Sequence, residues 1–249
     1  MKTRYLLALL LFPLSLTAAD YNTVILQQIA AMPRGGGYSV SHTATQNLQS
    51  AVTTQGGQLE VNAARAQPSY CSGATYLLFL KTLSTLAQQK QITLSPEALA
   101  ALRIKGQRDG EGVWGRWNAN GPGTAVLFSE LNLGKNFTSF AQAKPGDFMK
   151  VFWNDSIGRH EHGHSVVYLG MEKKDGVDYV RYWSSNKTPG GYAEKSVPAS
   201  KIILANFSRL ENPQNISKAA TLPAVDSYLA SMLVRDSTLA EAKQKANIQ

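Results

Sequence analysis

Cys71, the only cysteine in this chain of 249 residues, occupies the position best suited to nucleophilic chemistry. It starts the segment CSGATYLLFLKTLSTLAQQK, in which apolar residues recur at helical spacing. A thiol in the first turn of a helix lies near the positive end of the helix dipole and near unpaired N–H groups, which favour the thiolate. Ser72 and Gly73 are small, so a carbonyl group can approach the sulfur, and the Cys71 N–H can contribute to an oxyanion hole. The alternative role for a lone cysteine is a small buried hydrophobe.

A thiolate that attacks a carbonyl also needs a group that accepts and returns a proton, and histidine suits this role. The chain has four histidines: His42 stands alone, and the other three share the segment RHEHGHSVVYLG. His164 opens the apolar run SVVYLG, so a sheet would hold its ring firmly. We therefore expect His164 to be the general base, whereas His160 and His162 fit better as loop residues.

The alternate spacing of His160, His162 and His164 would also align three imidazoles on an extended chain, which raises the option of a metal site. A metal site would recruit a further Cys, Asp or Glu at a recognisable spacing. Glu161 would face away from this row, and Gly163 suggests a bend. We expect neither a metal nor another cofactor.

A third side chain should hold the imidazole through its other nitrogen. The segment VDYVRYWSSN, which follows the predicted His164 strand, offers Ser184, Ser185 and Asn186. Alternation along a strand places Ser184 and Asn186 on one face and Ser185 on the other. We favour Asn186, whose side-chain carbonyl can accept from an imidazole N–H, and keep both serines as alternatives. All three can also be simple turn residues, because a Pro-Gly pair follows them.

The elements that must position these residues come in two groups along the chain. Helical patterns precede residue 105, and short apolar runs bounded by Gly, Asp, Asn or Pro follow residue 145. Asp175 and Gly176 mark a hairpin between two of these runs, and Ser41 and Ser95 are suited to begin helices. The expected helices cover 21–32, 41–52, 71–90, 96–104 and a stretch after 223, and the expected strands cover 146–153, 164–171, 177–184 and 201–207. This order predicts an α+β fold in which the helix that starts at Cys71 packs on an antiparallel sheet, with extra helices at both ends of the chain.

Residues 108–136 are rich in glycine and irregular, so we expect a long surface loop there. Trp114 and Trp117 in this loop can stack on sugar rings. Together with Tyr70 and Ser72, which flank the cysteine, they are our candidates for substrate-binding residues. The alternative is that both tryptophans cover an edge of the core, because Trp is commonly buried.

Residues 1–19 have the pattern of an export signal, in which Lys2 and Arg4 precede an apolar run and a small-residue stretch that ends at Ala19. This run is too short to cross a bilayer, so cleavage after Ala19 would leave no integral membrane segment. We expect a periplasmic or secreted protein, in which a lone cysteine remains a free thiol. The formal net charge of +8, which includes the two leader charges, suits an anionic wall surface. Basic blocks interleaved with aromatics, as in a nucleic-acid groove, do not occur, so we expect no nucleic-acid partner.

Three motifs resemble those of the NlpC-type and CHAP superfamily of cell-wall cysteine peptidases and amidases. They are YCSGATY at the predicted helix start, KPGDFMKVF, and GHSVVYLG before a strand that ends in polar residues, within residues 65–190. The chain departs from the family pattern because Tyr70 replaces the usual Asp, the third residue is not His, and His164 lies unusually far from Cys71. The resemblance implies a papain-like core and cleavage of a peptidoglycan amide by Cys71 and His164. We expect Asp147 of the second motif to be a turn residue rather than a catalyst.

The combined expectation is an exported hydrolase that cleaves peptidoglycan stem peptides through an acyl-enzyme on Cys71. The alternatives are a papain-like protease or acyltransferase that acts on protein, and a wall-binding protein without activity. Peptidoglycan is the expected partner, and an inhibitory partner protein is a second option. The expected regions are a leader at 1–19, an N-terminal helical segment at 20–60, a catalytic domain at 61–210 and a C-terminal helical tail at 211–249.

Overall fold

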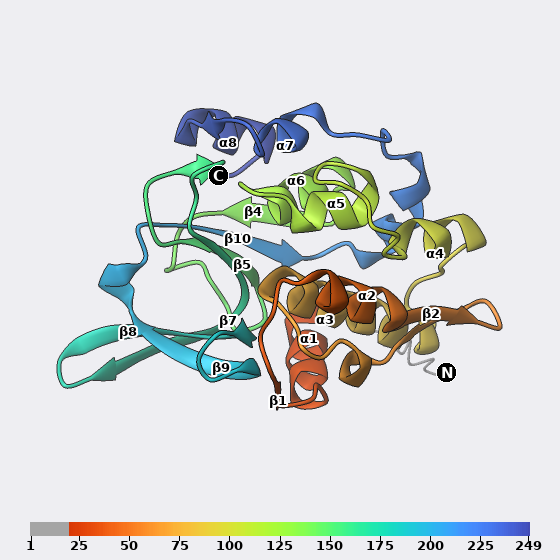
Figure 1. Ribbon diagram of the computed structural model, residues 1–249, viewed down its shortest axis with the longest axis horizontal. Helices are drawn as coiled ribbons and strands as arrows, with labels where there is room; N and C mark the ends of the chain where they lie inside the picture. The colour runs from red at the N-terminus through yellow and green to blue at the C-terminus, as the bar shows by residue number, and fades with distance from the viewer. Residues whose placement is uncertain (1–19) are drawn as a thin grey trace, which may run out of the picture.

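The computed structural model describes residues 20–249 (Figure 1), so the predicted leader at 1–19 lies outside the described residues. The α-helices are α1 (Tyr21–Ala30), α2 (His42–Ser50), α3 (Cys71–Gln88), α4 (Pro96–Leu102), α5 (Gly112–Asn118), α6 (Gly123–Glu130), α7 (Ser227–Ser231) and α8 (Leu239–Lys245). Short 3₁₀ helices cover η1 (Ala63–Arg65), η2 (Ala199–Lys201) and η3 (Pro213–Thr221). The strands are β1 (Gly35–Gly36), β2 (Val52–Gln55), β3 (Gln58–Val61), β4 (Gly134–Phe137), β5 (Phe148–Phe152), β6 (Ile157–Gly158), β7 (Gly163–Lys174), β8 (Val177–Asn186), β9 (Gly191–Pro198), β10 (Leu204–Leu210) and β11 (Asp236–Ser237).

A seven-stranded sheet in the order β1-β9-β8-β7-β5-β10-β4 organises the molecule, and each neighbouring pair in it is antiparallel. Asp175 and Gly176 have φ angles of 49° and 78° and join β7 to β8, which confirms the predicted hairpin. The four predicted strands correspond to β5, β7, β8 and β10, whereas β9 was not predicted because its residues are mostly polar or half-buried. The large antiparallel sheet beside many helices confirms the predicted α+β class.

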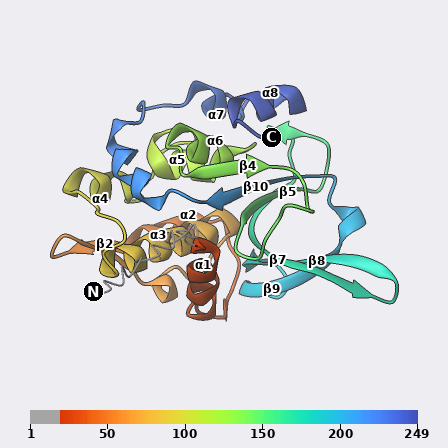
Figure 2. The same ribbon diagram turned by 180° about the vertical axis from the view of Figure 1, so that it is seen from behind.

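Side-chain alternation divides the apolar residues of this sheet between its two faces. Val167 and Trp183 join the core around α3, whereas Val166 and Tyr182 belong to a separate apolar cluster. Helix α3 packs against β7 and β8 on the first face, as Figure 2 shows from behind. This packing brings the start of α3 to the strands that carry the predicted histidine and its partner.

Helix α3 lies at the centre of the core and is buried on several sides. Every residue from Ser72 to Leu80 is buried. The sheet covers one side of the helix, and α1, α5 and β3 pack on other sides. Fully buried residues such as Leu77 and Phe79 each stabilise the fold by roughly 1.5–3 kcal/mol relative to exposure. Cys71 therefore begins a helix that the core surrounds on several sides.

The prediction of a long surface loop at residues 108–136 is wrong, because this stretch forms α5, α6 and β4. Trp114 and Trp117 are only 2% and 1% exposed and pack on Tyr76 of α3. Arg116 is also buried, paired with Glu130 and hydrogen-bonded to backbone carbonyls. The helices escaped prediction because they are short and begin at glycine, and tertiary burial of their aromatic side chains stabilises them.

The N-terminal segment at 20–60 contains the two predicted helices and also contributes to the sheet. Ser41 caps α2 and Ser95 caps α4 through their side-chain oxygens, as predicted. Gly56 and Gly57 form the turn of the β2–β3 hairpin, which was not predicted. Because β1 pairs with β9, this segment is joined to the main sheet.

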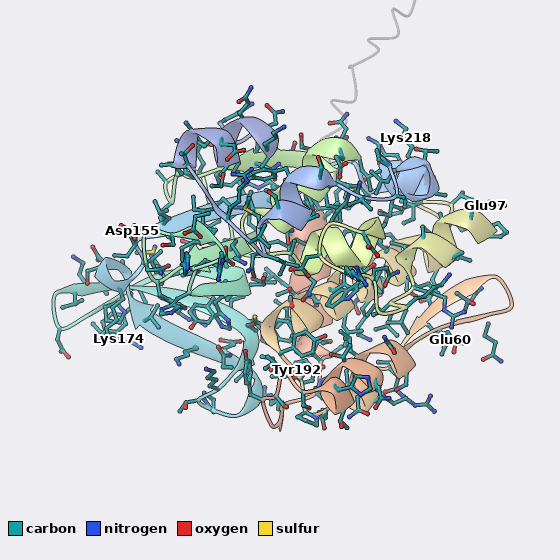
Figure 3. The ribbon with its side chains drawn as sticks, turned by 45° about the horizontal axis from the view of Figure 1, so that its top comes forward. Glu60, Glu97, Asp155, Lys174, Tyr192 and Lys218 are labelled. Carbon is teal, nitrogen blue, oxygen red and sulfur yellow. The ribbon has the colours of Figure 1, made fainter. Side chains whose placement is uncertain are left out.

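The C-terminal tail at 211–249 is helical in parts, through η3, α7 and α8, and its β11 strand pairs with β6. In Figure 3, Lys174 marks the β7–β8 hairpin and Glu60 marks the β2–β3 hairpin, which project in opposite directions. Among the helices described in residues 20–249, none has both the length and the apolar character needed to cross a membrane.

Asp147 fastens three distant parts of this fold. Its buried carboxylate accepts hydrogen bonds from Arg209 at 2.8 and 2.6 Å, from the Asn22 side chain at 2.8 Å and from the Lys144 N–H at 2.8 Å. These partners connect β10, α1 and the turn before β5. Asp147 is thus a turn residue, as expected, and also one half of a largely buried ion pair.

We expect Asp147→Ala to destabilise the fold by roughly 3–5 kcal/mol, because it leaves the Arg209 charge largely buried and without its partner. Urea unfolding measures the change. Arg181→Ala, which breaks the exposed Arg181–Glu194 pair, is the control and should cost less than about 1 kcal/mol. Equal losses in the two variants would show that the Asp147 pair has no special structural role.

Candidate active site

Cys71 is the first residue of α3, as the sequence predicted. Tyr70 is the N-cap residue in an extended conformation, and its side chain makes no capping hydrogen bond. The Tyr70 hydroxyl instead lies 3.5 Å from the Thr45 hydroxyl. The Tyr70 side chain therefore caps none of the backbone N–H groups in the first turn of α3.

The Cys71 thiol is half-buried and contacts the start of β7. The His164 imidazole and the Ser165 backbone N–H are neighbouring polar groups of its sulfur. Burial alone would raise the pKa of the thiol, but the neighbouring His164 imidazole, the Ser165 N–H and the Lys150 charge together lower that pKa to about 7. A substantial fraction of Cys71 is therefore thiolate near neutral pH.

Asn186, at the end of β8, lies against the other side of His164. The distance from His164 Nε2 to Asn186 Oδ1 is 3.1 Å. The Asn186 amide nitrogen donates to the carbonyls of Ser184 and Ala193 at 3.1 and 3.0 Å, which fixes its oxygen toward the imidazole. Because this oxygen can only accept, His164 Nε2 carries the proton of that bond. Nδ1 is then the ring nitrogen left to take the proton of the thiol.

The two serine alternatives to Asn186 have other partners. Ser184 Oγ donates to the Ser165 carbonyl at 2.7 Å, and Ser185 Oγ accepts from Ser69 Oγ at 2.8 Å. Both serines are fully buried. The structure thus brings together Cys71, His164 and Asn186, and it uses the serines to fix the strands around them.

Aromatic rings also restrain the imidazole. Tyr182 packs edge-on against His164 with ring centroids 5.6 Å apart, and Trp153 lies 6.4 Å away. His164 itself is half-buried. The ring is consequently held by packing on its faces and by Asn186 at Nε2, which is the rigidity that a catalytic base requires.

A lysine–glutamate pair lies beside the thiol, and it was not among the predicted site residues. Lys150 of β5 is opposite Ser165 in β7, and its Nζ lies 2.6 Å from Glu161 Oε1. Glu161 also accepts from the backbone N–H groups of Gly121 and Gly158, so it fixes the chain just before the histidine. A side chain at Gly163 would collide with this pair, which explains the glycine there. The one available signal was a lysine placed between Phe148 and Phe152 on an otherwise apolar strand.

The four predicted substrate-binding residues are all buried. Ser72 is buried and donates to Asn118 Oδ1 at 2.6 Å, and Asn118 in turn donates to Asp109 at 3.2 Å. Tyr70 is also buried. Contrary to expectation, Trp114 and Trp117 offer no wall to a substrate, because their rings lie inside the core.

The remaining histidines lie apart from this centre. His160 Nδ1 bonds to Asp236 at 2.7 Å, and His162 is exposed. Within residues 20–249, no three His, Cys, Asp or Glu side chains are grouped closely enough to hold a metal ion.

A cavity of about 730 Å³ lies elsewhere, between the end of α1, the β2–β3 hairpin and the later turns of α3. Its charged lining includes Glu60, Arg65 and Lys81, and it does not include Cys71, His164 or Asn186. The cavity therefore lies away from the residues that could carry out chemistry. The nucleophile, base and orienting amide make the Cys71 centre the candidate active site.

We expect alkylation of Cys71 by iodoacetamide to increase with pH to a plateau, with a midpoint near pH 7. His164→Ala should raise this midpoint and slow alkylation at pH 7 by roughly tenfold or more, because burial then opposes ionisation with less compensation. Asn186→Ala should move the midpoint in the same direction by less. Ser185→Ala is the matched control and should leave it unchanged. A midpoint that does not respond to His164→Ala would refute the thiolate–imidazole pair.

Comparisons with known proteins add no relative to this picture. No family model matches the chain, and neither the curated proteins nor the solved structures contain a match to it. The functional assignment therefore depends on the chemistry of the Cys71 centre.

Proposed function

We propose that the protein is a cysteine hydrolase with a papain-like core that cleaves an amide bond through an acyl-enzyme on Cys71. The observation that carries the proposal is the ordered contact of three groups. The Cys71 thiol lies next to His164, and His164 Nε2 lies 3.1 Å from a fixed Asn186 oxygen. A nucleophile, a base and a group that orients the base are the parts that thiol-dependent acyl transfer needs.

The geometry supports a two-step reaction. The Cys71 thiolate attacks the amide carbon, the carbonyl electron pair moves to oxygen, and the new C–S bond forms. As the tetrahedral adduct collapses, the C–N bond breaks and the His164 imidazolium gives its proton to the leaving amine. Water then attacks the thioester while His164 accepts its proton, which releases the acid and restores Cys71. Asn186 keeps the imidazole in the orientation that both steps require.

Peptidoglycan stem peptides are the substrate class that we propose. The motifs that resemble the NlpC-type and CHAP superfamily lie at the start of α3, at the start of β5 and in β7, so they contribute Cys71, Asp147 and His164. An export leader and a positive net charge also suit an enzyme of the periplasm or the cell exterior that meets an anionic wall. A substrate wall of tryptophans is not part of this proposal, since those rings are buried.

Digestion of purified peptidoglycan by the chain from residue 20 onward tests the proposal, with mass spectrometry of the released fragments. We expect one new amine and one new carboxyl end at a single type of amide. Cys71→Ala should abolish release, and His164→Ala should reduce it by about 10²–10⁴ because proton transfer is lost. His162→Ala removes an exposed neighbouring histidine and should leave the rate unchanged.

The fragments also separate the other candidate functions. Release of the same fragments by Cys71→Ala would overturn the proposed chemistry. Cleavage of an unfolded protein such as casein without any peptidoglycan fragment would assign the centre to a protein substrate. A wild-type chain that binds peptidoglycan but cleaves neither substrate would indicate a wall-binding role.

A further inference from the structure

A segment of three glycines and one tyrosine, Gly35 to Tyr38, lies against the candidate active site; we call it the glycine strap. Its glycines have φ angles of 68°, 84° and 79°, which side chains rarely adopt. A Cβ at Gly36 would lie 2.3 Å from the Gln67 side chain. The run of glycines therefore gives the strap a path that other residues could not follow.

The strap lies between strand β9, the neighbour of the strand that carries Asn186, and Ser69, which precedes α3. Gly36 pairs with Gly191 of β9, which is also the partner of Asn186 in β8. On its other side, Ser69 donates its N–H to the Gly37 carbonyl at 3.1 Å and accepts from the Ser39 N–H at 3.0 Å. Since Ser69 is two residues before Cys71, these bonds fix the position of Tyr38 relative to the helix start.

The half-buried Tyr38 side chain lies beside the nucleophile, close enough for the Cys71 thiolate to act on the pKa of its hydroxyl. Burial and the nearby thiolate raise the pKa of Tyr38 to about 12. The hydroxyl therefore keeps its proton throughout the pH range in which Cys71 becomes thiolate. Thiolate formation does not require the Tyr38 hydroxyl, because His164 and the Ser165 N–H already lower the pKa of the thiol.

We propose that the Tyr38 hydroxyl is a catalytic oxyanion donor, which together with the Cys71 N–H stabilises the tetrahedral intermediate. The oxyanion is bonded to the same carbon as the sulfur, so a donor that lies beside the sulfur also lies near that oxygen. When the C–S bond forms, negative charge moves from sulfur to oxygen. The Tyr38 hydroxyl can then donate a hydrogen bond to that oxygen and keep its proton. This inference rests on the proposed function.

The uncapped start of α3 supplies the other half of this arrangement. Tyr70 places no side-chain oxygen on the first turn, so the Cys71 N–H is open to a substrate oxygen. Two donors from different elements would then converge on one point beside the sulfur. An oxyanion hole with one backbone and one side-chain donor is a recognised way to stabilise the intermediates of acyl transfer.

Tyr38→Phe tests the inference, because it removes the hydroxyl and keeps the ring. We expect kcat for amide hydrolysis to fall by about 10²–10³, the usual loss for one oxyanion donor, with KM changed by less than about threefold. The Cys71 alkylation midpoint should move upward only slightly, since His164 remains. Tyr179→Phe on β8 is the control and should behave as wild type. Melting temperatures of all variants check that the fold is intact.

The outcomes distinguish this inference from the proposed function. If Cys71→Ala is inactive while Tyr38→Phe keeps kcat within about threefold of wild type, the oxyanion role is overturned and the hydrolase survives. If Cys71→Ala still hydrolyses the substrate, or the wild-type chain hydrolyses none, the proposed function and this inference both fail. A loss in Tyr38→Phe that is fully explained by a higher thiol pKa would assign Tyr38 to the thiolate and not to the oxyanion.

Discussion

The hydrogen bond between His164 Nε2 and Asn186 Oδ1 is the interaction on which the rest of the site depends. The Asn186 amide cannot turn over without losing two bonds to backbone carbonyls, so its oxygen always faces the ring. This fixes one imidazole nitrogen and commits the other to Cys71. Burial works against a thiolate, and the thiol ionises near neutral pH because the imidazole, the Ser165 N–H and Lys150 together outweigh it.

The fold positions the residues that make this contact. The adjacent antiparallel strands β7 and β8 place His164 and Asn186 at the same end of the pair. The buried helix α3 brings Cys71 to that end. Asp147 and Glu161 anchor the surrounding chain through largely buried ion pairs. Breaking such a pair leaves an uncompensated buried charge, so these carboxylates restrict the movement of the strands that carry the reactive groups.

Local signals in the sequence predicted much of this structure, and contacts between distant residues account for the failures. Serine caps, the Asp-Gly hairpin and the helix at Cys71 depend on neighbouring residues and could be predicted. Alternation favoured Asn186, but only the distant partners of Ser184 and Ser185 separate these serines from it. The buried tryptophans, the Lys150–Glu161 pair and the glycine strap arise from tertiary packing, which residue patterns along the chain do not encode.

Trapping of an acyl-enzyme would show directly whether Cys71 is the nucleophile. The chain from residue 20 onward is quenched in acid during turnover of a stem-peptide substrate and analysed by intact-protein and peptide mass spectrometry. We expect a mass increase equal to the acyl half of the substrate, located on Cys71 and removed by hydroxylamine, as expected for a thioester. Consumption of substrate by the wild type with no adduct on Cys71, together with undiminished consumption by Cys71→Ala, would contradict this expectation.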